Sequence, residues 1–211
     1  NTVLTFDNVL TYNKNFKKHG LEVMAGSSWT DSDYSNSWIN GSHYRSDQIQ
    51  TLNAANKISW DNTGTGASQW GIMSFFGRVA YNFDSKYLVT ANLRADGSSK
   101  LHPDHRWGVF PSFSAAWRIS SEKFMENLTW IDDLKLRGGW GQTGNQSGIG
   151  DYAYLQRYNI GRIEWFKKGG EGDSTDYANA VPTISQANMR KSDLTWDTTT
   201  QNNIGMDLTL L

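Results

Sequence analysis

The sequence predicts an all-β fold of antiparallel amphipathic strands, about seven in number, that form part of a large transmembrane β-barrel with long extracellular loops. Four segments between residues 74 and 143 alternate apolar and polar residues with a period of two, whereas an amphipathic helix repeats near 3.6. Each is about ten residues long, close to the length at which a tilted strand crosses a bilayer. Aromatic residues cluster at the strand ends, as they do at membrane interfaces. These residues are Tyr81, Phe83, Tyr87, Trp107 and Trp117.

The alternation assigns a face to each residue of these four segments. In the segment 87–96, Val89, Ala91 and Leu93 fall on one side, which we expect to face lipid. The intervening positions are polar, and no charge interrupts the apolar side of any of the four segments. The polar residues that we expect to face the barrel lumen are Arg78, Asn92, Arg94, Arg118 and Arg137. A soluble β-sandwich also alternates in this way, so alternation alone leaves both architectures open.

Three further strands are predicted outside this central region, at residues 4–12, 21–29 and 203–210, from the same period of two. Local signals predict details of the connections. Asp96-Gly97-Ser98-Ser99 is predicted to open a turn, and Pro111 on an apolar face suggests a bulge. Residues 121–128 are predicted to form a short helix capped by Ser120 or Ser121.

Two stretches, 30–72 and 144–193, lack alternation and are predicted to be long loops. Shorter and longer connections alternate along the chain, and in outer-membrane barrels the long loops face outside, so we expect both loops to be extracellular. Exposed apolar groups in polar loops usually have a partner, which makes loop aromatics candidate solute contacts. These candidates are Trp38, Tyr44, Trp70, Tyr154 and Trp165. The alternative is that they pack against one another or against a partner protein.

Composition excludes several classes of function. The 20 basic and 21 acidic residues nearly cancel, so nothing favours nucleic-acid binding, and without cysteine neither a disulfide nor a cysteine metal site is possible. No apolar run approaches the length of a transmembrane helix. The catalytic and nucleotide-binding motifs that we sought are missing, so we expect no enzyme and no cofactor. His102 with His105, and Asp31 with Asp33, lack the remaining ligands of a recognised motif, so we predict no metal site.

Several long segments resemble a known family in its order and spacing. They are NAANKISW (53–60), GRVAYNFDSKYLVTANLRADGSS (77–99), RWGVFPSFSAAWRISSEKFM (106–125), LKLRGGWGQTGNQ (134–146) and WDTTTQNNIGMDL (196–208). Together they resemble the barrel of SusC/RagA-type TonB-dependent outer-membrane transporters.

This resemblance implies a barrel of roughly 22 strands with an N-terminal plug. It implies import of oligosaccharides or peptides across the outer membrane of a Gram-negative, Bacteroidota-like bacterium. The energy would come from the inner-membrane TonB complex, and a SusD-like lipoprotein would form a lid. We therefore expect residues 1–211 to be a partial barrel domain, without the signal peptide, plug and remaining strands. The alternative of a different class is a soluble β-sandwich carbohydrate-binding module, which detergent dependence would distinguish.

Overall fold

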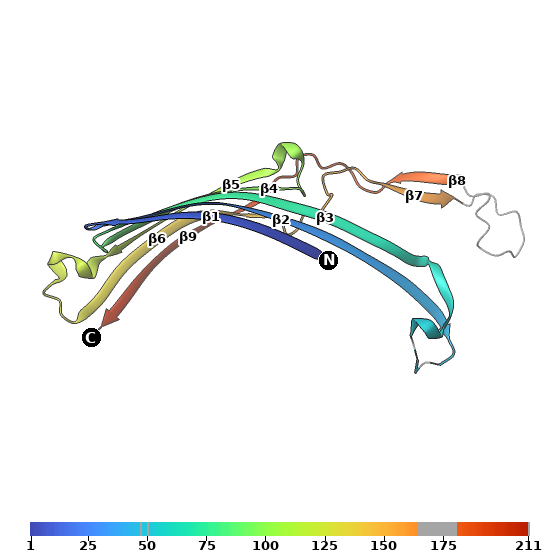
Figure 1. Cartoon of the computed structure of the whole chain (residues 1–211), viewed down its shortest axis with the longest axis horizontal. Coiled ribbons are helices and arrows are strands. Elements are labelled where there is room, and N and C mark those ends of the chain that lie inside the picture. Colours follow the sequence, from blue (N-terminus) through green and yellow to red (C-terminus); the bar gives the residue numbers. More distant parts are fainter. Residues whose placement is uncertain (47, 50, 164–180, 211) are drawn as a thin grey trace, which may run out of the picture.

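Seven strands form one antiparallel sheet in the order β1-β2-β3-β4-β5-β6-β9 (Figure 1). The computed structural model describes residues 1–46, 48–49, 51–163 and 181–210. The strands of the large sheet are β1 (Thr2–Phe16), β2 (His19–Tyr44), β3 (Ala55–Phe83), β4 (Tyr87–Ser98), β5 (Trp107–Arg118), β6 (Ile131–Asn145) and β9 (Asp197–Leu210). A separate two-stranded sheet joins β7 (Tyr158–Ile163) to β8 (Val181–Gln186). The predicted all-β fold with about seven antiparallel strands is confirmed.

The connections alternate between the two ends of the sheet, as predicted. At one end, short turns join β1 to β2 at Lys17–Lys18 and β3 to β4 at 84–86. Lys17, Asp84 and Ser85 have φ between 53° and 56°, the left-handed region that tight hairpins require. Residues 119–130 join β5 to β6 at this same end. The longer connections, from β2 to β3, from β4 to β5 and from β6 to β9, leave and re-enter the sheet at the other end. We call these the short-turn end and the long-loop end.

The pairing register gives the sheet two chemically different faces. Residues directly opposite each other in an antiparallel pair project to the same side. One such row runs through Val23, Val79, Ala91, Phe113 and Trp140, and the next through Met24, Arg78, Asn92, Ser112 and Gly141. We call the side of the first row the apolar face and the side of the second the polar face.

The apolar face is uncovered in the part of the chain that the structure describes. Its large side chains are exposed, including Phe6, Leu10, Val79, Leu93, Val109, Phe113, Trp140 and Ile204, and the last of these is 96% exposed. Only Leu101 and Phe110 are buried hydrophobic residues among those described. A soluble sandwich would bury such a face beneath a second sheet. An uncovered apolar face of this extent needs lipid or a protein partner.

The apolar band drifts steadily along the strands from one side of the sheet to the other. A single row of partners, Phe16, His19, Phe83, Tyr87, Trp117, Leu136 and Met206, provides a common reference level. Toward the long-loop end, the apolar side chains of β1 extend to Leu4, twelve residues from this level, whereas those of β9 extend only to Ile204, two residues from it. The shift of about ten residues over six strand spacings, at ~3.3 Å per residue and ~4.8 Å per strand, shows that the strands are strongly tilted relative to the band. Strands of membrane barrels are tilted in this way.

The prediction of a loop at 30–72 is wrong. Strand β2 continues to Tyr44 and β3 begins at Ala55, so that only residues 45–54, with a 3₁₀ turn at Leu52–Ala54, connect them. The two strands pair throughout except for a register shift between Trp38 and Asn40. Beyond Asp33, where pairing with β1 stops, the hairpin extends past its neighbours (Figure 1). Backbone hydrogen bonds hold this ribbon together without an apolar face, and alternation therefore gave no signal of it.

The turn predicted to open at Asp96 begins only at Ser99, and the predicted bulge at Pro111 is wrong. Gly97 lies within β4, and the ring of its partner Trp107 occupies the space where a Cβ would be, 2.8 Å from the nearest ring atom. The glycine therefore accommodates an aromatic neighbour and makes no turn. Pro111 pairs with Leu93 without a register shift, and pairing of β5 with β6 is confined to Ser112–Arg118, so Pro111 has no partner in β6.

The other two connection predictions need correction. Residues 121–128 do not form one helix: 3₁₀ turns at Ile119–Ser121 and Lys123–Met125 flank an extended Glu122, and neither turn has a side-chain cap. The stretch 144–193 is not wholly irregular, because it includes the end of β6 and the β7–β8 pair. No helix among the described residues is long and apolar enough to span a membrane.

Candidate functional site

The polar face carries ordered side-chain networks, the tightest of them around Arg94. Its Nε donates to both carboxylate oxygens of Asp96 at 2.7 and 2.8 Å, and its terminal nitrogen donates to Ser74 Oγ at 3.0 Å. Asp96 and Ser74 are buried. The guanidinium lies 5.8 Å from the centre of the Phe76 ring, which itself covers Gly26. A side chain at position 26 would occupy the space of that ring.

Each of the other arginines predicted to face the lumen also has a carboxylate partner on this face. Arg78 lies 3.9 Å from Glu22, and Arg118 lies 3.4 Å from Asp133. Asp207 lies 3.8 Å from Lys135 and 3.4 Å from Arg137. Such exposed pairs contribute only about 0–1 kcal/mol each to stability. Their main effect is that a face rich in charged groups has little net charge.

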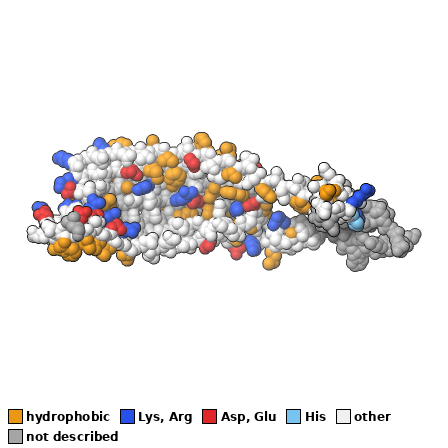
Figure 2. Space-filling model, turned by 90° about the horizontal axis from the view of Figure 1, so that it is seen from below, with side chains coloured by type: hydrophobic (Ala, Val, Ile, Leu, Met, Phe, Trp, Pro, Cys, Tyr) orange, Lys and Arg blue, Asp and Glu red, His pale blue; other side chains and the backbone are white. Residues whose placement is uncertain are grey.

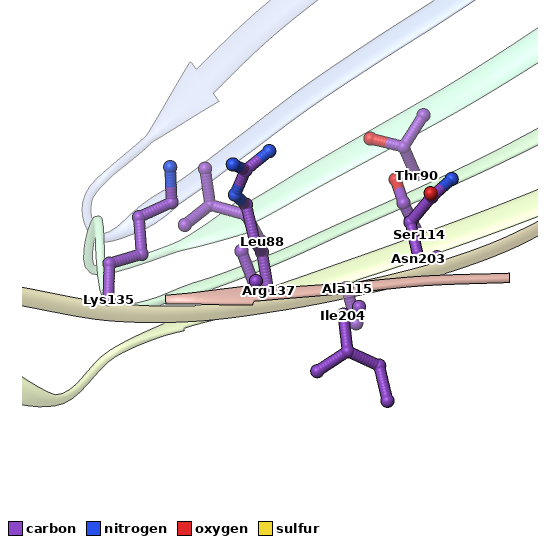
Figure 3. A pocket seen from close by; sticks show the side chains of 12 residues that line it. Leu88, Thr90, Ser114, Ala115, Lys135, Arg137, Asn203 and Ile204 are labelled. Carbon is purple, nitrogen blue, oxygen red and sulfur yellow. The ribbon is translucent and has the colours of Figure 1, made fainter. Parts of the chain in front are cut away.

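Open grooves run over this face, and two of them lie over β4, β5 and β6. The first, of 510 Å³, is lined by polar side chains from β4, β5, β6 and β9. In Figure 3 Lys135, Arg137, Thr90, Ser114 and Asn203 point to one side of the sheet, together with the apolar Leu88, while Ile204 points to the other. Figure 2 shows charged side chains gathered along the middle of one face of the molecule.

The second groove, of 490 Å³, lies toward the long-loop end, where β5 and β6 separate beyond the Ser112–Gly141 pair. Its aromatic lining is Phe110 and Trp196, whose rings meet edge to face at 5.5 Å. Trp196 Nε1 donates to the carbonyl oxygen of Arg106 at 2.9 Å, which fixes the indole. The remaining lining is mostly polar: besides Ile72 it includes Asn92, Arg94, Asp96, Ser112 and residues 142–147. We call it the rim groove.

A tilted sheet with an uncovered apolar face and a charge-paired polar face is typical of barrel walls, and sequence comparison agrees. A family described as TonB dependent receptor-like, β-barrel matches residues 1–210. The chain belongs to this family. It is therefore a section of a receptor barrel and not an enzyme.

Individual relatives give the same assignment. The chain is 36% identical over 97% of its length to TonB-dependent receptor P39 of Formosa agariphila, and 38% identical over 66% of its length to TonB-dependent receptor SusC of Bacteroides thetaiotaomicron. It covers 18% and 13% of these two proteins. Among solved structures, the RagAB peptide transporter superposes on 98% of the chain with a TM-score of 0.77 at 24% identity, and the chain covers 21% of it. That likeness shows the fold.

The TonB-dependent receptor fold separates the aromatic residues that were predicted to contact solute. Trp38 lies in the projecting part of β2, 45% exposed, with its ring over Gly64, and the half-buried Tyr44 ends the same strand. Trp70 is half-buried in β3, and Lys100 Nζ lies 5.1 Å from its ring centre. Tyr154 meets His102 edge to face at 5.9 Å. Trp165 lies outside the described residues.

The aromatic residues predicted to contact solute do not all lie together. Trp70 and Tyr154 contact the connection between β4 and β5 at the long-loop end, through Lys100 and His102 respectively. Trp38 and Tyr44 lie farther out on the β2–β3 hairpin. The rim-groove aromatics Phe110 and Trp196 were missed. A signal for Phe110 was available, because it is an aromatic residue at an even position of β5, on the polar side.

The residues examined as metal ligands have other partners. His102 lies 3.4 Å from Asp104 and 3.2 Å from Arg190, and its ring centre is 6.5 Å from that of His105. Asp31 accepts a hydrogen bond from Gln69 at 3.5 Å. Within the described part of the chain no three His, Cys, Asp or Glu residues come together to hold a metal ion.

Proposed function

We propose that this chain is part of the wall of an outer-membrane TonB-dependent transporter that imports oligosaccharides or peptides. The observation that carries the proposal is the division of the tilted sheet into an uncovered apolar face and a charge-paired polar face. In this arrangement the first face contacts lipid and the second, with Arg78, Asn92, Arg94, Arg118 and Arg137, lines the lumen. The short-turn end is periplasmic, and the long-loop end is extracellular.

The edges of the sheet support a larger barrel. Strands β1 and β9 each have a neighbour on one side only among the described residues. An open edge in lipid would leave backbone groups unsatisfied at several kcal/mol each, so a membrane-spanning sheet needs further strands to close it. We propose that residues 1–211 are a partial barrel domain completed by other strands and by a plug that reaches the TonB complex.

The solute class rests on the chemistry of the polar face and on the relatives. Hydroxyl, carboxamide and mutually neutralised charged groups suit solutes rich in hydroxyls or amides. In the rim groove the half-buried Trp196, backed by the buried Phe110, can stack on a sugar ring or a peptide side chain. RagAB is named as a peptide transporter. By analogy with SusC we propose a SusD-like lipoprotein as the extracellular partner. No observation favours the β-sandwich carbohydrate-binding module.

The test uses the full-length transporter with its lipoprotein partner in the outer membrane. Alanine is introduced singly at Trp38, Tyr44, Trp70, Tyr154 and Trp165, and uptake of oligosaccharide and peptide pools is measured. Trp130, exposed at the short-turn end, provides the control, because Trp130→Ala should leave uptake unchanged. Unchanged uptake for all five variants at normal surface expression would remove these aromatics from the solute path. Failure of the unmodified transporter to import either pool would refute the proposed solute class.

A further inference from the structure

Residues 146–157, which we call the strap, lie beside the part of β3 that β4 no longer pairs with. Pairing of β4 with β3 ends at Ser98 opposite Ile72. Beyond that point Ser99 takes over both backbone groups of Gly71: its Oγ accepts from the Gly71 amide at 2.8 Å, and its own amide donates to the Gly71 carbonyl at 2.9 Å. Farther along, the Gln69 amide donates to the hydroxyl of Tyr152 at 2.9 Å. Ser99 and, farther along, Tyr152 of the strap therefore supply hydrogen-bond partners at the edge of β3 that β4 leaves open.

Lys100 joins the strap to β3 through three different contacts. Its Nζ lies 3.1 Å from Asp151 Oδ1 and donates to the Ile149 carbonyl at 3.3 Å. The same nitrogen lies 5.1 Å from the centre of the Trp70 ring. The Lys100 and Asp151 side chains are only 16% and 19% exposed, so water screens this pair less than it screens the ion pairs of the polar face.

Asp151 depends on these contacts to remain charged. Burial raises the pKa of its carboxyl, but the hydrogen bond from Ser68 and the nearby Lys100 ammonium outweigh burial and leave that pKa below its ordinary value. Removal of the Lys100 charge would leave a partly buried carboxylate with Ser68 as its remaining partner among these groups. Such a carboxylate gains by moving into water, and the strap would move with it.

The strap also forms one side of the rim groove. Gln146 and Ser147 line that groove together with Arg94 and Trp196. Gln146 accepts a hydrogen bond from the fully buried Ser98, which ties this part of the strap to the end of β4. A displacement of the strap from β3 would therefore change the width of the rim groove.

We propose that Lys100 is a positioning residue that holds the strap against β3 and so sets the shape of the rim groove in which solute binds. The binding part of this inference rests on the proposed function. The part that concerns the strap rests on the contacts of Lys100 alone. Arginine at this position keeps the positive charge and the cation–π contact, whereas methionine keeps the length and loses both.

The experiment compares Lys100→Met, Lys100→Arg and Asp151→Asn in the full-length transporter with its partner. Hydrogen exchange of peptides that cover 66–72 and 146–157 reports strap opening. Concentration-dependent uptake separates apparent KM from maximal rate. Lys123→Met, an exposed lysine at the short-turn end, is the matched control and should change neither.

We expect Lys100→Met and Asp151→Asn to raise exchange of both peptides about tenfold. Both variants should raise the apparent KM several-fold at a nearly constant maximal rate. In Lys100→Arg, hydrogen exchange and the apparent KM should both stay within about twofold of the unmodified transporter. Unchanged exchange in Lys100→Met would overturn the inference, and increased exchange with an unchanged KM would refute the positioning role. If the unmodified transporter imports no solute, the proposed function fails, while the exchange data still decide whether Lys100 holds the strap.

Discussion

Tyr87 and Trp117 lie directly opposite each other on β4 and β5, and both donate a hydrogen bond to the same carboxylate oxygen of Glu122. Their rings are stacked, with centroids 6.4 Å apart and planes 9° from parallel. The Tyr87 hydroxyl and the Trp117 indole nitrogen lie 2.7 and 3.2 Å from Glu122 Oε1. The two rings continue a row of paired residues, Phe16, His19 and Phe83, with centroid spacings of 5.4, 4.9 and 6.3 Å between successive members up to Tyr87. Rings with an apolar body and a polar tip are suited to a membrane interface.

The contacts of Glu122 predict a pH-dependent stability. The hydrogen bond from Tyr87, then that from Trp117, together with Lys86 at 3.3 Å, holds the pKa of the Glu122 carboxyl below its ordinary value despite partial burial. A lowered folded-state pKa gives stability that is present above the ordinary carboxyl pKa and is lost as pH falls through the lowered value. Glu122→Gln should therefore be less stable at neutral pH and lose less on acidification.

Thermal unfolding of the detergent-solubilised full-length transporter across an acid pH series measures this effect. Glu126→Gln, at an exposed neighbouring carboxylate, is the control and should retain the acid-dependent loss of the unmodified protein. An identical acid-dependent loss in Glu122→Gln would show that Glu122 does not supply it.

The two faces of the sheet predict opposite tolerances to arginine at adjacent positions. Ala91 lies in the middle of the apolar face and Asn92 on the polar face. Ala91→Arg should destabilise the barrel by about 2–4 kcal/mol if it lies near the bilayer midplane. Asn92→Arg loses the hydrogen bond to Ser112 and should cost no more than about 1.5 kcal/mol. Folding titrations in lipid measure both, and the reverse order would mean that the two faces are exchanged.

Two glycines of adjacent strands should respond differently to alanine. At Gly26 a Cβ would lie 2.5 Å from the Phe76 ring and 2.7 Å from the carbonyl oxygen of Asn8, so backbone as well as side chain would have to move. Gly26→Ala should cost about 1–3 kcal/mol. At Gly77 the nearest atom would be 3.7 Å away, and Gly77→Ala should be neutral or stabilise by about 0.5–1 kcal/mol. Denaturant titration of the full-length barrel compares them, and equal effects would contradict the packing of Phe76 on Gly26.

Cysteine labelling tests which end of the sheet faces outside. Ser37 lies on the exposed, projecting part of β2 and Thr129 in the exposed connection at the short-turn end. In intact cells Ser37→Cys should react with a membrane-impermeant thiol reagent, whereas Thr129→Cys should react only after the outer membrane is broken. Ser174, a second position predicted to be extracellular, lies outside the described residues. Labelling of Thr129→Cys alone in intact cells would invert the topology.

The sequence by itself determined the number of strands in the large sheet, its two faces and the alternation of shorter and longer connections. Where a strand has lipid on one side and a polar surface on the other, apolar and polar residues must alternate along it. The order Val89, Thr90, Ala91 shows this alternation directly in the sequence. The same reasoning failed beyond the apolar band. There, strands such as the outer half of β2 are held by backbone pairing, which places no period on side chains.

Only the tertiary structure decided which residues from distant segments come together. Register brings Arg78 opposite Asn92, and the long connections bring Lys100 to Asp151 and Trp70, and Trp196 to Phe110. The structure also shows that the missing side chain of Gly97 makes room for the Trp107 ring, whereas the sequence had indicated a turn there. Alternation reflects the local environment on each side of a strand, whereas these contacts depend on where loops return to the sheet, which the order of polar and apolar residues does not specify.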